Sequence, residues 1–107
     1  MKAIQFLGDT RERLRDFPAD ARIRAGYELR EVQKGNDPSD WKPMKSVGPG
    51  VREIRIRLSD GAFRVIYLAT LPQCVLVLHA FEKKTEQTHP KDIELAGQRL
   101  KKWKAQQ

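Results

Sequence analysis

Hydrophobic and polar residues alternate in this chain with two regular periods, one typical of strands and one typical of helices. Residues 51–58 follow the strand period without interruption, with aliphatic Ile54 and Ile56 between charged Glu53 and Arg55. Successive side chains of a strand point to opposite faces of the sheet. The pattern therefore predicts a strand with one face in the core and one charged face in water.

Residues 74–85 form the most apolar stretch of the chain and end in a cluster of His79, Phe81, Lys83 and Lys84. An unbroken apolar, β-branched run predicts a strand that is buried on both faces or lies near the centre of a sheet. We therefore expect this strand to carry ionisable and cationic side chains to one rim of the fold. The remaining elements are interpreted as arranged around it.

Turn signals define the other predicted strands. Residues 59–61, Ser-Asp-Gly, predict a tight turn, so residues 62–70 are expected to return antiparallel to residues 51–58. Residues 2–7 are short and mixed, which is typical of an edge strand. Residues 36–50 contain three prolines and two glycines and are predicted to be a loop.

Two helices are predicted near the N-terminus. Asp9 followed by Glu12 has the spacing of a capping box, which predicts a short helix as far as about Asp16. Pro18 suits the first turn of a second helix over roughly residues 19–34, because its missing N–H costs nothing there. The apolar positions of this second helix recur on one side, as expected of a helix that covers a sheet.

A last helix is predicted from Pro90 to about residue 104. Acidic residues occupy its first turn and lysines its last, so both ends complement the helix dipole. We expect its apolar stripe to pack on the protein's own sheet; the stripe consists of Ile93, Ala96, Leu100 and Trp103. The predicted order is β-α-α-β-β-β-α, an α+β fold, and 107 residues suffice for one domain with two layers.

Charge is distributed unevenly along the chain. Residues 1–40 carry eight Lys/Arg and eight Asp/Glu, whereas residues 41–107 carry thirteen against six, so the whole net charge of +7 lies in the second part. Such a field favours phosphate-rich or acidic partners. No apolar run is long enough to span a bilayer and the N-terminus lacks the pattern of a signal peptide, so we expect a cytoplasmic protein. The single cysteine, Cys74, begins an apolar strand, which indicates a packing role.

Four short segments occur in an order that is typical of one protein family. They are Trp41–Lys45, Gly50–Arg55, Phe63–Tyr67 and Leu78–Thr85 with Pro90. Over roughly residues 10–104 the chain resembles the RelE/ParE superfamily of type II toxin–antitoxin toxins, most closely its HigB-like, phage-derived subgroup. The resemblance implies a small antiparallel sheet with two N-terminal helices on one face. It also implies a ribonuclease that cuts messenger RNA, usually in the ribosome, and an antitoxin partner that is encoded next to it and often has a helix-turn-helix domain.

Cleavage of RNA without a metal requires a base for the 2′-OH proton, cations that stabilise the phosphorane, and an acid that protonates the departing 5′-oxygen. The sequence contains no cluster of Asp, Glu and His with metal-ligand spacing, so we expect no metal and no cofactor. The catalytic candidates are Arg64, His79, Lys84 and Glu53.

Each catalytic candidate also has a structural interpretation. Arg64 interrupts an apolar strand and suits bidentate binding of phosphate, and the resemblance makes it a functional arginine, but a cross-strand ion pair with Glu53 would also explain it. Glu53 is a candidate base, although a glutamate between arginines is more often a salt-bridge partner. His79 has an intrinsic pKa suited to proton transfer, although a lone histidine on an apolar strand is usually a core residue. Lys84 is a candidate acid or an ordinary solvated cation.

A second group of residues is expected to hold the RNA; it comprises Lys45, Arg52, Arg55, Lys83, Tyr67 and Phe81. Within this group, Arg55 shares a strand face with Glu53, whereas Arg52 points to the other face. Tyr67 and Phe81 suit stacking on a base, with core packing as the alternative.

Two other functions fit the same composition. A ParE-like toxin would inhibit DNA gyrase by binding alone, and a non-toxic basic module would bind nucleic acid as a regulator. The ionisable groups on the sheet favour the nuclease, which predicts a definite geometry. We expect Arg64, His79 and Lys84 to converge on one hollow that can hold a scissile phosphodiester.

Overall fold

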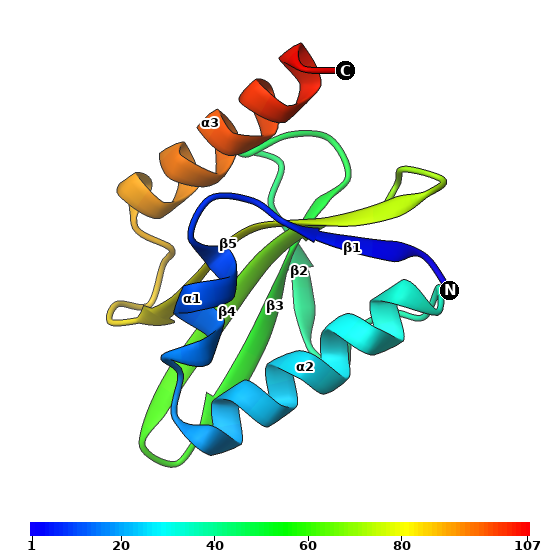
Figure 1. Ribbon diagram of the computed structural model, residues 1–107. Helices are drawn as coiled ribbons and strands as arrows, with labels where there is room; N and C mark the ends of the chain where they lie inside the picture. The colour runs from blue at the N-terminus through cyan, green and yellow to red at the C-terminus, as the bar shows by residue number, and fades with distance from the viewer.

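The computed structural model describes residues 1–107 as a five-stranded sheet with helices on both faces (Figure 1). The elements in chain order are β1 (Ala3–Phe6), α1 (Thr10–Arg15), α2 (Ala19–Gln33), β2 (Trp41–Pro43), β3 (Val51–Leu58), β4 (Gly61–Leu68), β5 (Cys74–Lys83) and α3 (Pro90–Ala105). The strand order is β1-β5-β4-β3-β2. The predicted α+β class is confirmed, as is the order of the three helices and four of the strands.

The sheet differs from the prediction in two features. Residues 41–43, inside the segment predicted to be a loop, form the short strand β2, which pairs antiparallel with β3. Pro43 is tolerated because β2 lies at the sheet edge, where a missing N–H breaks no ladder. In addition, β1 pairs in parallel with β5, so the sheet is mixed, with antiparallel pairing among its other strands as the resemblance implies.

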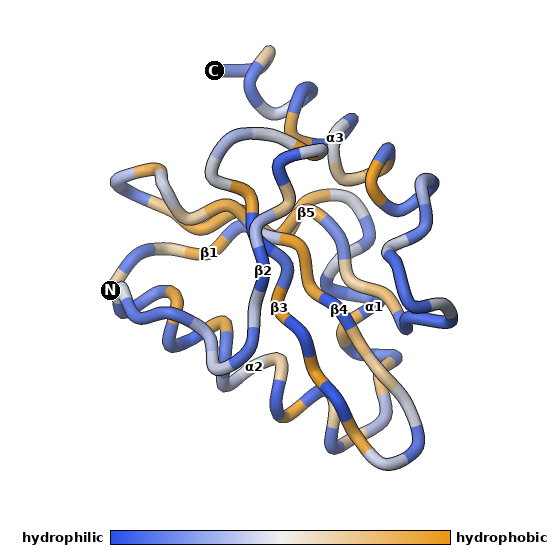
Figure 2. Tube along the Cα trace, turned by 180° about the vertical axis from the view of Figure 1, so that it is seen from behind, coloured by the Kyte–Doolittle hydropathy of each residue, from blue (hydrophilic) through white to orange (hydrophobic).

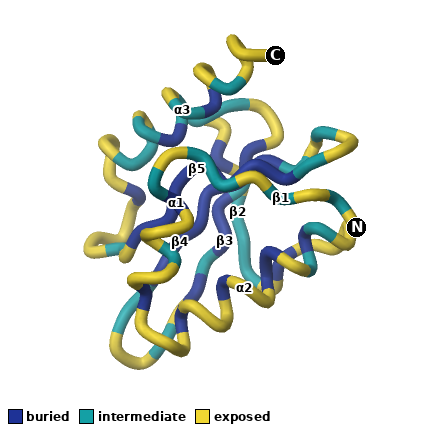
Figure 3. The backbone as a smooth tube through the Cα atoms, viewed as in Figure 1, coloured by how far each residue is buried: buried dark blue, intermediate teal, exposed yellow.

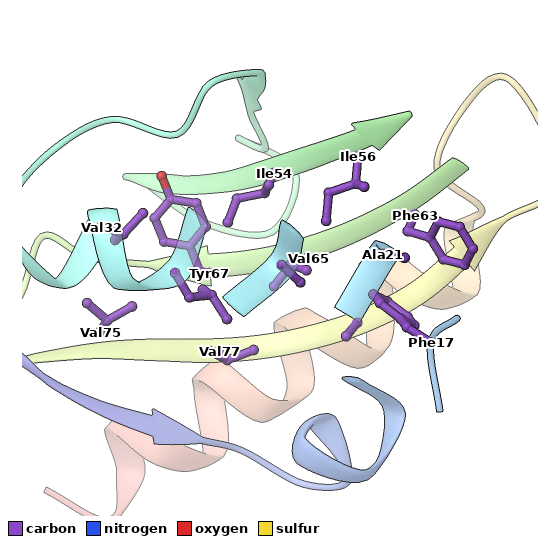
Figure 4. Close-up of a cluster of buried hydrophobic side chains, with 13 residues drawn as sticks. Phe17, Ala21, Val32, Ile54, Ile56, Phe63, Val65, Tyr67, Val75 and Val77 are labelled. Atoms are coloured by element: carbon purple, nitrogen blue, oxygen red, sulfur yellow. The ribbon is translucent and has the colours of Figure 1, made fainter. Parts of the chain in front are cut away.

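One face of the sheet is covered by α1 and α2. The core on this α2 side contains 13 buried hydrophobic residues (Figure 4). Ala21 and Ala25 of α2 are completely covered, so the helix packs closely against the sheet. The figure shows Val65 and Tyr67 of β4 among these side chains. Burial of this apolar surface is the main force that holds α2 in place.

The opposite face is covered by α3, so the protein has three layers and the prediction of two layers is wrong. The core on this α3 side joins Ala96 and Leu100 of the helix to Leu76 and Leu78 of β5, which confirms that the last helix packs on the protein's own sheet. Cys74 is half-buried against the same core, which agrees with a packing role. No helix combines the length and apolarity needed to cross a membrane.

A β-bulge in β5 changes which side chains face α3. Tyr67 pairs with Val77 and Ile66 pairs with His79, which leaves Leu78 as the extra residue. A strand in uniform register would turn His79 toward α2, because Val77 faces α2. The bulge brings three side chains onto the face that also carries the charges of β3; they are His79, Phe81 and Lys83.

The start of α1 is fixed by a contact with α3 rather than by the predicted capping box. Asp9 makes no cap hydrogen bond with its side chain. Its carboxylate instead accepts from Arg13 Nε at 2.9 Å and from Arg99 Nη2 at 2.5 Å. Gly8 has φ +56°, and a Cβ there would clash with Arg99 Nε, so glycine makes room for this contact.

Candidate functional site

Cross-strand registry places the polar side chains of the α3 side in rows at one end of the sheet. Figure 2 views this face and shows hydrophilic and hydrophobic residues alternating along β3. Toward the β3–β4 turn, the rows across β3, β4 and β5 are Glu53–Ile66–His79, Arg55–Arg64–Phe81 and Arg57–Ala62–Lys83. The fold therefore gathers four cations around one acid on neighbouring strands.

The cations line an open hollow of about 640 Å³, which we call the cationic hollow. Its lining residues are Arg55, Arg57, Ala62, Arg64, Lys83, Lys84, Thr85 and Glu86. Five of these side chains are cationic and one is acidic, so the hollow attracts anions. No residue of α3 lines it, which leaves it open to a large ligand.

Arg64 is buried at the floor of the cationic hollow. Its Nε lies 3.5 Å from Oε1 of Glu53, and its Nη1 donates to the carbonyl of Phe63 at 3.0 Å. The side chains of Arg64 and Glu53 are 4% and 0% exposed, so the ion pair is withdrawn from water. Burial lowers the pKa of the Arg64 guanidinium, and the charge of Glu53 opposes that shift. Arg64 thus pairs with Glu53 and also faces the hollow.

Glu53 is held by groups from two further segments. The Thr88 hydroxyl donates to Oε2 at 2.6 Å, and Lys42 Nζ lies 3.9 Å from Oε1. Thr88 belongs to the connection between β5 and α3, which therefore crosses this end of the sheet and covers the carboxylate. Glu53 pairs with Arg64 but does not line the cationic hollow, so it fixes the position of the arginine without facing a ligand there itself.

Arg55 and Arg64 lie directly opposite each other on β3 and β4. Like charges in this arrangement destabilise a sheet. Arg55 makes no ion pair, and its Nε is buried without a hydrogen-bond partner, whereas the Nε of Arg64 lies 3.5 Å from Oε1 of Glu53. The charge of Arg55 is therefore unpaired within the chain, and an anion in the hollow would offset its repulsion with Arg64.

The two lysines at the end of β5 differ in their surroundings. Lys83 is half-buried, and burial lowers its pKa; the nearby Arg64 and Lys42 lower it further. The Lys84 side chain is 77% exposed and pairs with Glu82 at 3.2 Å. Lys83 is therefore the better proton donor of the two, and Lys84 contributes charge at the rim.

His79 does not join the hollow, so the expected convergence holds for Arg64 and Lys84 only. His79 is 1% exposed and stacks on Phe81 with ring centroids 4.9 Å apart. Its Nε2 lies 2.7 Å from Oδ1 of Asp92 in the first turn of α3, and its Nδ1 has no partner. Burial lowers the pKa of the imidazole, although Asp92 acts in the opposite direction. Phe81, at 6% exposure, also lies outside the hollow.

The remaining residues expected to hold RNA lie elsewhere. Arg52 is on the α2 side, where it stacks over Trp41 at 3.8 Å and pairs with Asp37 at 2.8 Å. Tyr67 is 1% exposed in the α2-side core, and burial raises its pKa. Lys45 is exposed in the turn after β2 and does not line the cationic hollow.

Two polar residues of the site carried no sequence signal. Thr88 and Glu86 lie in a polar turn where hydroxyls and carboxylates are ordinary. Only the path of this turn across the sheet shows that Thr88 holds Glu53 and that Glu86 lines the cationic hollow.

A second hollow, of about 360 Å³, lies beside α1 and has the opposite charge. Its acidic lining residues are Asp9, Glu12, Asp16 and Glu82, with Arg13 as the only cation. It would repel phosphate, so an anionic ligand is directed to the cationic hollow. No group of three or more His, Cys, Asp or Glu side chains in the chain is arranged to hold a metal ion.

Comparison with known families gives one match. The model of a family described as "Phage derived protein Gp49-like (DUF891)" matches residues 12–101. This range includes β2 to β5 and every residue that lines the cationic hollow. No curated protein matches the chain.

Proposed function

Because this chain belongs to the Gp49-like family of phage-derived proteins, part of the RelE/HigB-like toxin group, we propose that it is the toxin of a type II toxin–antitoxin system. The proposed activity is metal-free cleavage of messenger RNA in the ribosomal A site, without a cofactor. Gp49 toxins pair with antitoxins. The partner proposed here is a helix-turn-helix antitoxin encoded by the adjacent gene.

The opposed pair Arg55 and Arg64 is the observation that carries this proposal. The arginines face each other across β3 and β4, both line the cationic hollow, and Arg55 has no ion-pair partner. A planar guanidinium can donate to two oxygens of a phosphodiester. When both arginines bind one phosphate, its negative charge offsets the repulsion between them. The pair is thus arranged for an anion that becomes more negative during the reaction.

The cationic hollow supplies groups for each step of RNA cleavage. The 2′-oxygen attacks phosphorus and the bond to the 5′-oxygen breaks, which leaves a 2′,3′-cyclic phosphate and a 5′-hydroxyl. Arg55 and Arg64 stabilise the phosphorane, and Lys83, with its lowered pKa, protonates the departing 5′-oxygen. Glu86 is the only carboxylate that lines the hollow and is the proposed acceptor of the 2′-OH proton. Lys84 holds the RNA backbone at the rim.

Besides Lys84 at the rim, two further catalytic candidates from the sequence receive supporting roles in this proposal. Glu53 orients Arg64 from below, because Thr88 covers it and it does not reach the hollow. His79 connects β5 to the first turn of α3 through Asp92. It thereby helps to position the connection that carries Glu86 and Thr88.

The kinds of side chain that line the hollow support action in the ribosome. Ala62 is its only hydrophobic lining residue, and no aromatic side chain lines it. Proteins that bind single-stranded RNA by themselves usually stack bases on aromatic rings. A site with cations and no aromatic side chain for stacking needs another molecule to hold the bases. A translating ribosome holds the codon in place.

The test is inducible expression of the wild type, Arg55→Ala and Arg64→Ala, with growth recorded and messenger RNA ends mapped. Lys104→Ala is the matched control, because it removes one exposed positive charge at the far end of α3. We expect growth arrest and cleaved messages for the wild type and the control, and a loss of cleavage of about 100-fold for Arg64→Ala. Arg55→Ala keeps the result interpretable if the buried Arg64 is needed for folding.

Three results would contradict the nuclease. Breaks in DNA without cleaved messages would favour gyrase inhibition. Normal growth on expression of the wild type would favour a non-toxic regulatory module. Full activity of a folded Arg55→Ala variant would show that the cationic hollow is not the site of RNA cleavage.

A further inference from the structure

Lys83 carries an amine that no other group of the chain engages. It is the last residue of β5, and Figure 3 shows this strand buried along most of its length and the connection after it largely exposed. The half-buried side chain lines the cationic hollow and a smaller adjoining hollow of about 170 Å³. Its Nζ makes no hydrogen bond or ion pair, whereas Nζ of Lys84 lies 3.2 Å from Glu82.

The surroundings of Lys83 favour the neutral form of its amine. Burial lowers the pKa of Lys83, and the positive charges of Arg64 and Lys42 lower it further, with Glu53 acting in the opposite direction. Only a neutral amine attacks a carbonyl carbon. Lys83 is therefore a more reactive nucleophile than an ordinary solvated lysine.

The same hollow holds an anion-binding pair beside this amine. Arg55 and Arg64 form the row next to the one that contains Ala62 and Lys83, and two residues along a strand span about 7 Å. The side chain of Ala62, directly opposite Lys83, is small and leaves space between the strands. An anion held by the two arginines thus lies within reach of the flexible lysine side chain.

An acyl phosphate has both features that this arrangement selects, a small charged phosphate for the arginines and an electrophilic carbonyl carbon for the amine. We propose that the cationic hollow binds small acyl phosphates, such as acetyl phosphate, and directs their acyl group to Nζ of Lys83. The neutral Nζ attacks the carbonyl carbon, and the bond from this carbon to the bridging oxygen breaks. Inorganic phosphate leaves with the electron pair and takes up the proton that Nζ loses, so the products are an uncharged amide and hydrogen phosphate.

Acylation switches the site off. It removes the positive charge of Lys83 and its ability to donate a proton. This consequence rests on the proposed function, in which Lys83 protonates the departing 5′-oxygen. The acylation itself rests on the unpaired amine and the arginine pair of the hollow.

The test measures acetylation at each lysine of the purified chain. After incubation with acetyl phosphate, the chain is unfolded, its remaining amines are blocked with deuterated acetic anhydride, and mass-spectrometric fragments report the light acetyl fraction. We expect Lys83 to react at least about tenfold faster than the exposed Lys104, because bound phosphate concentrates the reagent at the amine. This advantage should shrink in Arg55→Ala, in excess inorganic phosphate, and with an uncharged acetylating reagent that has no phosphate.

Equal rates at Lys83 and Lys104 would overturn the proposal. So would an advantage of Lys83 that inorganic phosphate does not reduce, a measurement on the wild type that stands even if Arg55→Ala fails to fold.

Cleavage of messenger RNA on ribosomes tests the consequence. Cleavage by the treated wild type should fall in proportion to the acetylated fraction of Lys83. Lys83→Arg is the matched control, because it keeps the charge and lacks the amine, so its residual cleavage should not change on treatment. Undiminished cleavage by a chain fully acetylated at Lys83 would overturn the regulatory role. Absence of cleavage by the untreated wild type would instead overturn the proposed function and leave the acetylation rates valid.

Discussion

The buried pair of Glu53 and Arg64 predicts a large loss of stability for Glu53→Gln. The substitution keeps the shape of the side chain, and its amide oxygen still accepts the hydrogen bond of Thr88. It removes the negative charge that lies 3.5 Å from Arg64 Nε. The Arg64 side chain, at 4% exposure, would then remain buried beside Arg55 without a countercharge.

The size of the effect follows from this geometry. Two unit charges 3.5 Å apart attract by about 5 kcal/mol at an effective dielectric constant of about 20. Neutralising Glu53 also removes the cost of burying its own charge, which offsets part of that loss. We expect a net loss of about 3 kcal/mol, the usual range for breaking a buried pair. For a chain of 107 residues this lowers the melting temperature by about 13 °C.

The assay is urea unfolding followed by circular dichroism for Glu53→Gln, Arg64→Met and the double variant. The double variant removes both charges, so we expect a coupling free energy of about 2 kcal/mol between the two sites. Arg57→Gln is the control, because Arg57 pairs with Asp40 on the surface, and it should change stability by less than about 0.5 kcal/mol. Additive effects, or a loss below about 1 kcal/mol for Glu53→Gln, would show that Glu53 and Arg64 are not energetically coupled.

Three further predictions concern Thr88 and Glu86 in the connection between β5 and α3, and His79, which links β5 to α3 through Asp92. Thr88→Val removes the hydrogen bond to the buried carboxylate of Glu53, so we expect a loss of about 1.5 kcal/mol in urea unfolding and faster proteolysis within residues 84–87. Burial lowers the pKa of His79 below its ordinary 6.5, so the unfolded chain binds the extra proton as the pH falls. Stability should therefore fall below pH 6.5 by up to about 1.4 kcal/mol per pH unit until the lowered pKa is passed, and unfolding titrations of His79→Gln should lack this component. Glu86→Gln should slow message cleavage on ribosomes by about 100-fold with unchanged stability, and an unchanged rate would eliminate Glu86 as the base.

The sequence predicts elements well where local pattern and burial agree. The alternation of β3 and the turn at residues 59–61 define a hairpin without help from distant residues. The strand β2 and the parallel direction of β1 are different, because they depend on which neighbours these short segments find in the folded sheet. The third layer also depends on where the connection after β5 leads the chain.

The candidate site was predictable to a similar extent. Arg64 stands out because a charge inside an apolar strand needs a partner or a ligand, and the structure provides Glu53 and the cationic hollow. The bulge at Leu78 has no pattern of its own, although it decides the direction of every later side chain in β5. His79 is withdrawn from the hollow by its long-range contact with Asp92, which no local pattern reveals.

The chemistry of the RNA ends shows whether the 2′-oxygen attacks the phosphodiester in the cationic hollow. Purified toxin is added to ribosomes stalled on a defined message, and the ends and rates are determined for the wild type and Arg55→Ala. We expect cleavage in the A-site codon with 2′,3′-cyclic phosphate and 5′-hydroxyl ends, at a rate at least about tenfold lower for the variant. Ends with a 3′-hydroxyl and a 5′-phosphate, or equal rates for the two proteins, would contradict it.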